Sequence, residues 1–482
     1  MWRLYKLLVG LITCNPISKV GGYMATFGTI SGVIYTVMTI LYGAENAYAG
    51  IIFLSVVPTT FFGGLILVPL GIYLEFRRRH KVDPSLGEKP LGAILQNLSG
   101  ESDVRNRIIT FVLFSGANVV LTMGIFVASL DYLDSPAFCG LLCHTVMIPE
   151  YTTYQRSPHA RVPCVDCHIG PGASWFVKSK ISGIRQVYAV MAKTYSRPIP
   201  TPIEELRPAR ETCEKCHWPE KFHQDKLKII THYKNDRNNT KYYTAVLLKV
   251  GGPEAEGAKP TGIHWHVSGG NRVIYASEKG ERKDIPWIRF ERDGQPPVEY
   301  RFTGSSLTDA QIAALPKRTM DCVDCHNRPT HIYRSADIEL ETMFARFPEL
   351  QTVPYLKRAA SEVLAQHFSE EAVQNGGVRK ALRTWYGAHP EEKPDSRLLE
   401  QAAEKVQEIY RENVWPEMNI GWGTYPNHIG HTASQGCLRC HGNNHVTAEG
   451  KAVRSDCRLC HTVLAIEEEK PPLFDFMVHK EK

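Results

Sequence analysis

The sequence predicts a membrane-anchored protein in which three transmembrane helices precede a mainly α-helical and irregular soluble part with a small antiparallel β insert. Two observations predict this fold class. Three long stretches without a charged residue fall within the first 130 residues, and six copies of a cysteine–histidine motif all follow them. The length of 482 residues also favours a division into parts, because a single hydrophobic core stops growing at about 250–300 residues.

The three charge-free stretches predict the transmembrane helices. They are residues 20–44, 46–74 and 108–130, and none of them contains Asp, Glu, Lys or Arg. Each exceeds the roughly 20 residues that an α-helix needs to cross the hydrocarbon core of a bilayer. Buried helices of a large soluble protein are the weaker alternative, because three such stretches occur in one chain.

The distribution of Lys and Arg predicts the orientation of these helices. The N-terminal segment contains Arg3, Lys6 and Lys19, and the loop after the second stretch contains seven basic residues, whereas the loop around Glu45 has none. The positive-inside rule therefore places the N-terminus and the basic loop in the cytoplasm of a bacterium. The third helix would then deliver everything after Leu130 to the periplasmic side of the inner membrane.

Twelve of the thirteen cysteines fall in six motifs that each end in Cys-His. The cysteines of these motifs are Cys139 and Cys143, Cys164 and Cys167, Cys213 and Cys216, Cys322 and Cys325, Cys437 and Cys440, and Cys457 and Cys460. The histidines that follow them are His144, His168, His217, His326, His441 and His461. In a Cys-x-x-Cys-His motif the two thiols form thioether bonds with haem, and the adjacent imidazole reaches the iron. The motifs predict six covalently bound haem c groups, and with the anchor they predict a membrane-anchored multihaem cytochrome c.

Zinc sites and disulfides are the alternatives for these cysteines. A structural zinc ion needs four ligands, usually from paired Cys-x-x-Cys units, and most of these motifs stand alone in the sequence. Disulfides outside the cytoplasm would not explain a histidine after every second cysteine. Haem attachment, which bacteria carry out outside the cytoplasm, also agrees with the predicted orientation.

The first motif differs from the other five. Three residues separate Cys139 from Cys143, and Met147 follows His144 by three positions. Met147 is either a packing residue or an axial thioether ligand that would favour reduced iron. The sequence leaves both interpretations open.

The chain is expected to divide into four parts. These parts are a membrane anchor at 1–130, a region with the first three motifs at 131–224, a β-rich insert at 225–305 and a C-terminal region with the last three motifs at 306–482. Within the insert, runs rich in β-branched and aromatic residues predict strands at 241–250, 263–267 and 272–275. Helix-period spacing of apolar residues predicts helices at 175–195, 354–368 and 396–413.

Histidines outside the motifs are candidate distal ligands, because imidazole is a common ligand of haem iron. Nine of the thirteen lie near a motif, namely His159, His223, His232, His264, His266, His331, His428, His431 and His445. All of these except His223 and His232 are predicted to bind iron, and six haems need at most six distal ligands. His264 and His266 flank Trp265 in a predicted strand, which would place both imidazoles on one side.

Several of these features together resemble the NapC/NirT family of membrane-anchored multihaem quinol dehydrogenases. They are the anchor before the haems, a methionine after the first motif, and the run Tyr154-Gln-Arg-Ser-Pro-His159 leading into Cys164-Val-Asp-Cys-His168. The remainder, including Ile263-His-Trp-His266 and Tyr425-Pro-Asn-His-Ile-Gly-His431, looks like the larger inner-membrane members with extra haems and three membrane helices. Those members include cytochromes tied to respiration on extracellular metals.

The resemblance implies oxidation of quinol at the outer face of the inner membrane, beside the first haem. Electrons would then pass along the haems to a periplasmic redox protein or to other subunits of a respiratory complex. It also implies that His159 binds a haem other than its nearest one, and that Lys178 or Lys180 lies near the quinol. The extra residue in the first motif and the position of Met147 depart from the smaller family members.

The chemistry of a quinol supports the same site independently. A quinol dissolves in lipid and releases two protons with two electrons, so it needs a titratable group near the membrane. The available candidates are Lys178, Lys180, Asp131, Asp134 and Glu150, of which Lys178, Lys180 and Asp131 are the predicted site residues. The expected substrate is menaquinol or another quinol. The alternative for the two lysines is a position at the lipid interface on an amphipathic helix.

Two other functions are weighed against this one. A multihaem reductase of a small oxyanion needs an iron with an open distal position, and the surplus of histidines argues against one. An electron-wiring subunit would carry the same haems but would lack its own quinol site. The net charge of +6 is modest and no basic stripe is present, so membrane lipid and the quinone pool are expected partners and nucleic acid is not.

Overall fold

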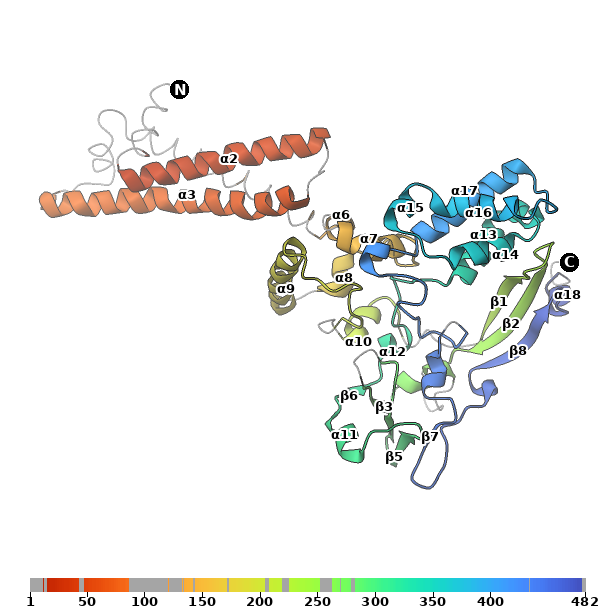
Figure 1. Cartoon of the computed structure of the whole chain (residues 1–482). Coiled ribbons are helices and arrows are strands. Elements are labelled where there is room, and N and C mark those ends of the chain that lie inside the picture. Colours follow the sequence, from red (N-terminus) through yellow and green to blue (C-terminus); the bar gives the residue numbers. More distant parts are fainter. Residues whose placement is uncertain are drawn as a thin grey trace. The chain divides into compact units, whose positions relative to one another are not determined.

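The computed structural model describes residues 12, 15–42, 47–85, 120, 132, 134–141, 144–170, 173–203, 208–218, 225–251, 262–268, 270–278, 282–432 and 434–478. The chain forms two compact units, Met1–Met147 and Ile148–Lys482 (Figure 1). The first unit extends past the expected anchor boundary at residue 130 and includes Cys139 of the first motif.

Two long antiparallel helices form most of the described part of the first unit. They are α2 (Pro16–Tyr42) and α3 (Ala47–Val82). A Cβ atom on Gly64 would lie only 2.5 Å from the backbone nitrogen of Ala25, so the absence of a side chain lets the two backbones approach closely. The hydroxyl of Ser18 donates to the carbonyl oxygen of Val68 at 2.9 Å and adds a polar link between the helices.

The membrane prediction is supported in part by this unit. Helices occur where the stretches 20–44 and 46–74 predicted them, and the second helix continues to Val82. Among the described residues, the segment Val57–Val82 is long and apolar enough to cross a membrane. The predicted third helix at 108–130 lies outside the described residues except for Val120, so three transmembrane helices stay a prediction.

The cysteine–histidine motifs of the second unit lie on short helices joined by irregular chain. These helices are α8 (Cys164–His168), α10 (Ala209–Cys213), α12 (Cys322–Cys325), η6 (Gly436–Arg439) and η7 (Cys457–Leu459). The predicted helix at 175–195 is α9 (Ala173–Met191). In the first motif, α6 (Pro136–Leu141) carries Cys139 and α7 (His144–Gln155) begins at the motif histidine.

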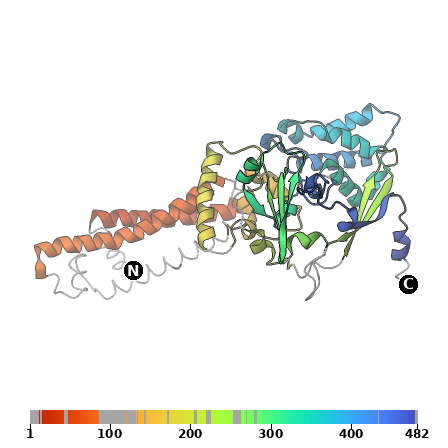
Figure 2. The same cartoon turned by 90° about the horizontal axis from the view of Figure 1, so that it is seen from below.

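A helical lobe without any motif separates the fourth motif from the fifth. It consists of α13 (Ala336–Arg346), η4 (Pro348–Thr352), α14 (Leu356–Leu364), α15 (Glu370–Gln374), α16 (Gly377–Gly387) and α17 (Ser396–Arg411), which lie together in both views (Figure 2). Leu340, Phe344, Leu364 and Leu382 are completely buried in its core. The predicted helices at 354–368 and 396–413 are confirmed as α14 and α17, because their apolar residues form the stripes that pack into this core.

The strands form two antiparallel sheets. One has the order β1 (Asp225–Tyr233), β2 (Lys241–Lys249), β8 (His461–Glu468), and the other has the order β6 (Lys317–Thr319), β3 (Asn271–Ala276), β4 (Trp287–Arg292), β5 (Gln295–Phe302), β7 (His445–Val446). Strands occur at two of the three predicted places, 241–250 and 272–275. A self-contained insert ending at residue 305 does not form, because β6, β7 and β8 come from later in the chain.

The third predicted strand is wrong. Residues Ile263–Val267 form a 3₁₀ turn, η3, which follows Gly262 with a φ of 76°. A positive φ is favourable for glycine and turns the chain away from an extended course. The ring of Trp265 then packs on Phe290, with ring centroids 4.9 Å apart. Tertiary packing has therefore overridden the β preference of this run.

Candidate haem-binding site

The local structure of the motifs gathers their reactive groups on one side of a helical turn. The backbone N–H of the motif histidine donates to the carbonyl of the first cysteine at 2.8 Å in the third and fourth motifs, and at 3.1 Å in the fifth. Residues spaced three and four positions apart share one face of such a turn. The two thiols and the imidazole of a motif can therefore address the same haem.

Five motif histidines each face a histidine from elsewhere in the chain. The ring centroids are 6.2 Å apart for His168 and His331, 5.9 Å for His217 and His159, 6.4 Å for His326 and His264, 5.7 Å for His441 and His266, and 6.1 Å for His461 and His431. Two imidazoles bound to opposite sides of one metal ion have ring centres about 6 Å apart, because each metal–nitrogen bond is about 2 Å long and each ring centre lies about 1 Å beyond its nitrogen. The ring centres of these five pairs therefore lie at about the separation at which two imidazoles could hold one haem iron.

Backbone carbonyls orient several of these imidazoles. Nδ1 donates to the carbonyl of Ile263 at 2.8 Å in His266, to that of Glu150 at 2.9 Å in His331, and to that of Pro329 at 3.1 Å in His159. Because a carbonyl can only accept, the proton lies on Nδ1, and Nε2 keeps the lone pair that iron binds. Burial also lowers the pKa of His266 and favours the neutral form.

The remaining candidate histidines are not among the five pairs with a motif histidine. In His445, Nε2 donates to the carbonyl of Ile285 at 2.7 Å, so this nitrogen holds a proton and cannot bind iron. His428 is deeply buried, its Nδ1 points at the carbonyl of Asp324 at 3.4 Å, and burial lowers its pKa to about 4. The prediction of His445 as a ligand rested on its closeness to a motif in the sequence, and the fold of β7 directs its ring elsewhere. Nδ1 of His232 lies 2.7 Å from a carboxylate oxygen of Glu341, whereas His223 lies outside the described residues.

The 3₁₀ turn also corrects the expectation for His264 and His266. Their imidazoles do not serve one side of a strand. His264 faces His326 of the fourth motif, and His266 faces His441 of the fifth, with Nε2 atoms 3.4 Å apart in the second pair. One short turn therefore connects two neighbouring motifs.

Cysteines of successive motifs lie close enough to influence one another. A hydrogen bond with Cys213 of the third motif, together with burial, raises the pKa of Cys322 of the fourth. Burial and the nearby Cys437 of the fifth motif raise the pKa of Cys325 to about 11. The second and third motifs meet in the same way at Cys167 and Cys213, and the fifth and sixth meet at Cys437 and Cys460. The second to sixth motifs thus follow one another in space as they do in the sequence.

The expected quinol residues are only partly described. Lys178 is exposed on α9, whereas Asp131, Cys143 and the side chains of Lys180 and His144 lie outside what the structure describes. Met147 is half-buried on α7. The ligation of the first haem therefore stays a prediction.

Comparison with known proteins decides the family. Residues 102–205 match the NapC/NirT cytochrome c family, N-terminal region. The chain is 39% identical to the cytochrome c-type protein ImcH of Geobacter sulfurreducens over 465 residues, which cover 95% of this chain and 89% of that protein. The chain belongs to the NapC/NirT cytochrome c family.

A second relative covers less of the chain. The cytochrome c-type protein NrfH of Wolinella succinogenes is 31% identical over 117 residues, which are 22% of this chain and 66% of that protein. No solved structure matches the chain. Membership of the NapC/NirT family makes the chain a membrane-anchored cytochrome with covalently bound haem that transports electrons. The five imidazole pairs fit this cofactor.

Proposed function

We propose that this NapC/NirT protein is a hexahaem quinol dehydrogenase of the bacterial inner membrane. It oxidises menaquinol and passes the electrons through its haems to a periplasmic or extracellular-respiration partner. Its N-terminus lies in the cytoplasm and its haem region lies in the periplasm. The observation that carries the proposal is the series of five imidazole pairs on motifs that follow one another in space.

The residues of the chain would hold five of the haems through a pair of imidazoles each. Each of the second to sixth motifs would supply two thiols and one imidazole, and the second imidazole would come from His331, His159, His264, His266 and His431 in motif order. Haem held in this way supplies a one-electron carrier without a free coordination position. This arrangement favours electron transfer over reduction of a small oxyanion, which needs an open position at the iron.

Helix α9 supports a quinol site near the membrane surface. Its side chains Ile181, Ile184, Tyr188 and Met191 repeat at helical spacing and are 65–73% exposed. No Asp or Glu occurs between Asp166 and Glu204. An apolar stripe beside cationic residues is typical of a helix that lies at a lipid interface. Lys178 and Lys180 on this helix, and separately Asp131, are the residues that we propose for binding the quinol or assisting the loss of its protons.

The test of this function uses the full chain in lipid nanodiscs. A menaquinol analogue should reduce the haems, and dithionite should reduce them as completely. Reduction by dithionite but not by menaquinol would support the electron-wiring subunit instead. Dominant high-spin signals in the electron paramagnetic resonance (EPR) spectrum of the oxidised protein would support the reductase.

The haem count gives a separate prediction. The intact mass should exceed that of the polypeptide by six haem groups, because six motifs each offer two thiols and one imidazole. A variant with Cys139 and Cys143 replaced by alanine should lose one group. Haem attachment at the first motif would be contradicted if the wild type carried only five haem groups and the variant carried the same five.

A further inference from the structure

The second and fourth motifs have the same sequence, Cys-Val-Asp-Cys-His, but their aspartates have opposite surroundings. Asp166 in the second motif is exposed to solvent. Asp324 in the fourth motif is 1% exposed. Burial of a carboxylate costs free energy unless several hydrogen-bond donors compensate it, so Asp324 is expected to have such donors around it.

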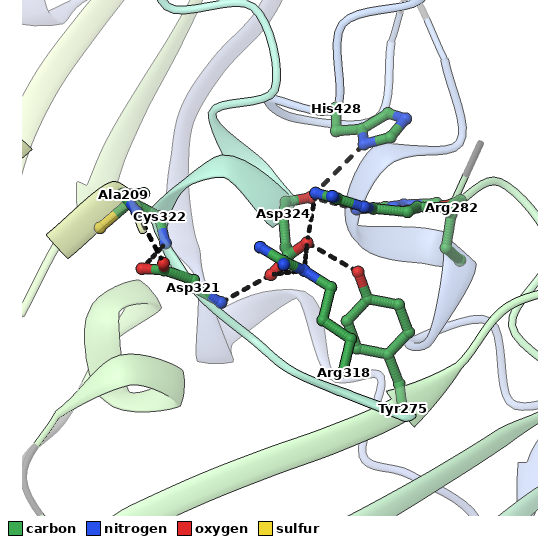
Figure 3. A network of polar contacts seen from close by, with 9 residues as sticks. Ala209, Tyr275, Arg282, Arg318, Asp321, Cys322, Asp324 and His428 are labelled. Atoms are coloured by element: carbon green, nitrogen blue, oxygen red, sulfur yellow. Dashed lines mark hydrogen bonds and ion pairs between the residues drawn. The ribbon is translucent and has the colours of Figure 1, made fainter. Parts of the chain in front are cut away.

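The carboxylate of Asp324 accepts hydrogen bonds from four residues (Figure 3). Oδ1 accepts from the hydroxyl of Tyr275 at 2.6 Å, from Arg282 at 3.0 Å and from Nε of Arg318 at 2.9 Å. Oδ2 accepts from the backbone N–H of Asp321 at 2.6 Å. Charge-assisted bonds of this kind hold a carboxylate in one orientation.

The same network reaches the motifs on either side. Arg439, which stands between the two cysteines of the fifth motif, donates to the backbone carbonyl of Asp324 at 2.7 Å and to that of Arg282 at 2.6 Å. Asp321 accepts from the N–H of Ala209 at 3.2 Å, at the start of the helix that carries Cys213 of the third motif. Three consecutive motifs are therefore joined around one buried carboxylate.

We infer that Asp324 is a positioning residue that fixes the fourth haem site against its two neighbours and whose buried negative charge lowers the reduction potential of the haem there. The inference rests on the proposed haem attachment at Cys322 and Cys325. Oxidised haem iron carries one more positive charge than reduced iron, so a nearby negative charge favours the oxidised form. Asp166 cannot act as strongly, because water and salt screen an exposed charge.

The test compares Asp324→Asn with Asp166→Asn, the same change in the same local sequence. Redox titration of the purified full chain, followed by the EPR signals of individual low-spin haems, gives the midpoint potentials. Asp324→Asn should raise at least one midpoint potential by about 59 mV, which corresponds to a tenfold change in the equilibrium constant of a one-electron reduction. Asp166→Asn should leave all midpoints within a small fraction of that shift.

A second variant keeps the test decisive if Asp324→Asn does not fold. Arg282→Gln removes a positive charge from the same carboxylate at a side chain that is 17% exposed. It should shift a midpoint downward, opposite to the effect of Asp324→Asn, whereas a purely structural role predicts no such change of sign. Unchanged midpoints in a folded variant with its full haem mass would overturn the inference alone. A wild-type chain without haem on Cys322 and Cys325 would overturn both the inference and the hexahaem proposal.

Discussion

Replacement of His331 by alanine should convert one haem from low-spin to high-spin iron. His331 faces His168 at 6.2 Å, and its Nδ1 is fixed by the carbonyl of Glu150, so alanine would leave the iron of the second motif with one axial ligand. The EPR spectrum of the oxidised variant should lose one low-spin centre and gain one high-spin signal. Menaquinol should then reduce the haems of the later motifs much more slowly, since the proposed electron path from the quinol to them includes the second haem.

His445→Gln is the matched control for this prediction. His445 also lies beside a motif in the sequence, but its Nε2 donates to the carbonyl of Ile285, and a glutamine amide can replace that bond. This variant should keep every low-spin centre of the wild type. A high-spin signal from His445→Gln, or none from His331→Ala, would contradict the pairing of histidines described above.

One of the variants Lys178→Leu and Lys180→Leu should slow haem reduction by a menaquinol analogue on the order of 100-fold. A loss of this size is at the lower end of the range for a positioned acid–base group. The side chain would stabilise the bound quinol or assist the departure of its proton. Reduction by dithionite, which reaches exposed haems directly, should hardly change. Stopped-flow absorbance of the haems measures both rates in the same nanodisc preparation.

Arg185→Leu separates the two roles that a cation on α9 can have. Arg185 is exposed on the same helix, and its replacement by leucine removes one positive charge from that helix, as each lysine variant does. A role in binding quinol predicts that only one of the lysine variants is slow. Equal loss of rate in Arg185→Leu would instead point to contact of α9 with lipid. Wild-type rates in both lysine variants would remove these residues from the mechanism.

The sequence by itself determined the features that depend on local spacing. The interval between cysteines and histidine sets which groups meet on one turn, so the haem motifs could be recognised without a fold. Helix-period stripes likewise located α14 and α17, because a buried stripe must repeat with the turn of the helix. The same reasoning drew attention to His159, His264, His266, His331 and His431 through their closeness to motifs.

Only the tertiary structure decided which of these residues meet. His168 and His331 are brought together by packing of distant segments, and no local pattern separates His431, which faces a motif histidine, from His445, which does not. The run Ile263–Val267 has β-forming residues but turns at Gly262 because Trp265 packs on Phe290. Asp166 and Asp324 stand in identical motifs, yet one is solvated and the other is held by two arginines. Burial and charge environment arise from contacts between segments far apart in the sequence, so local spacing cannot encode them.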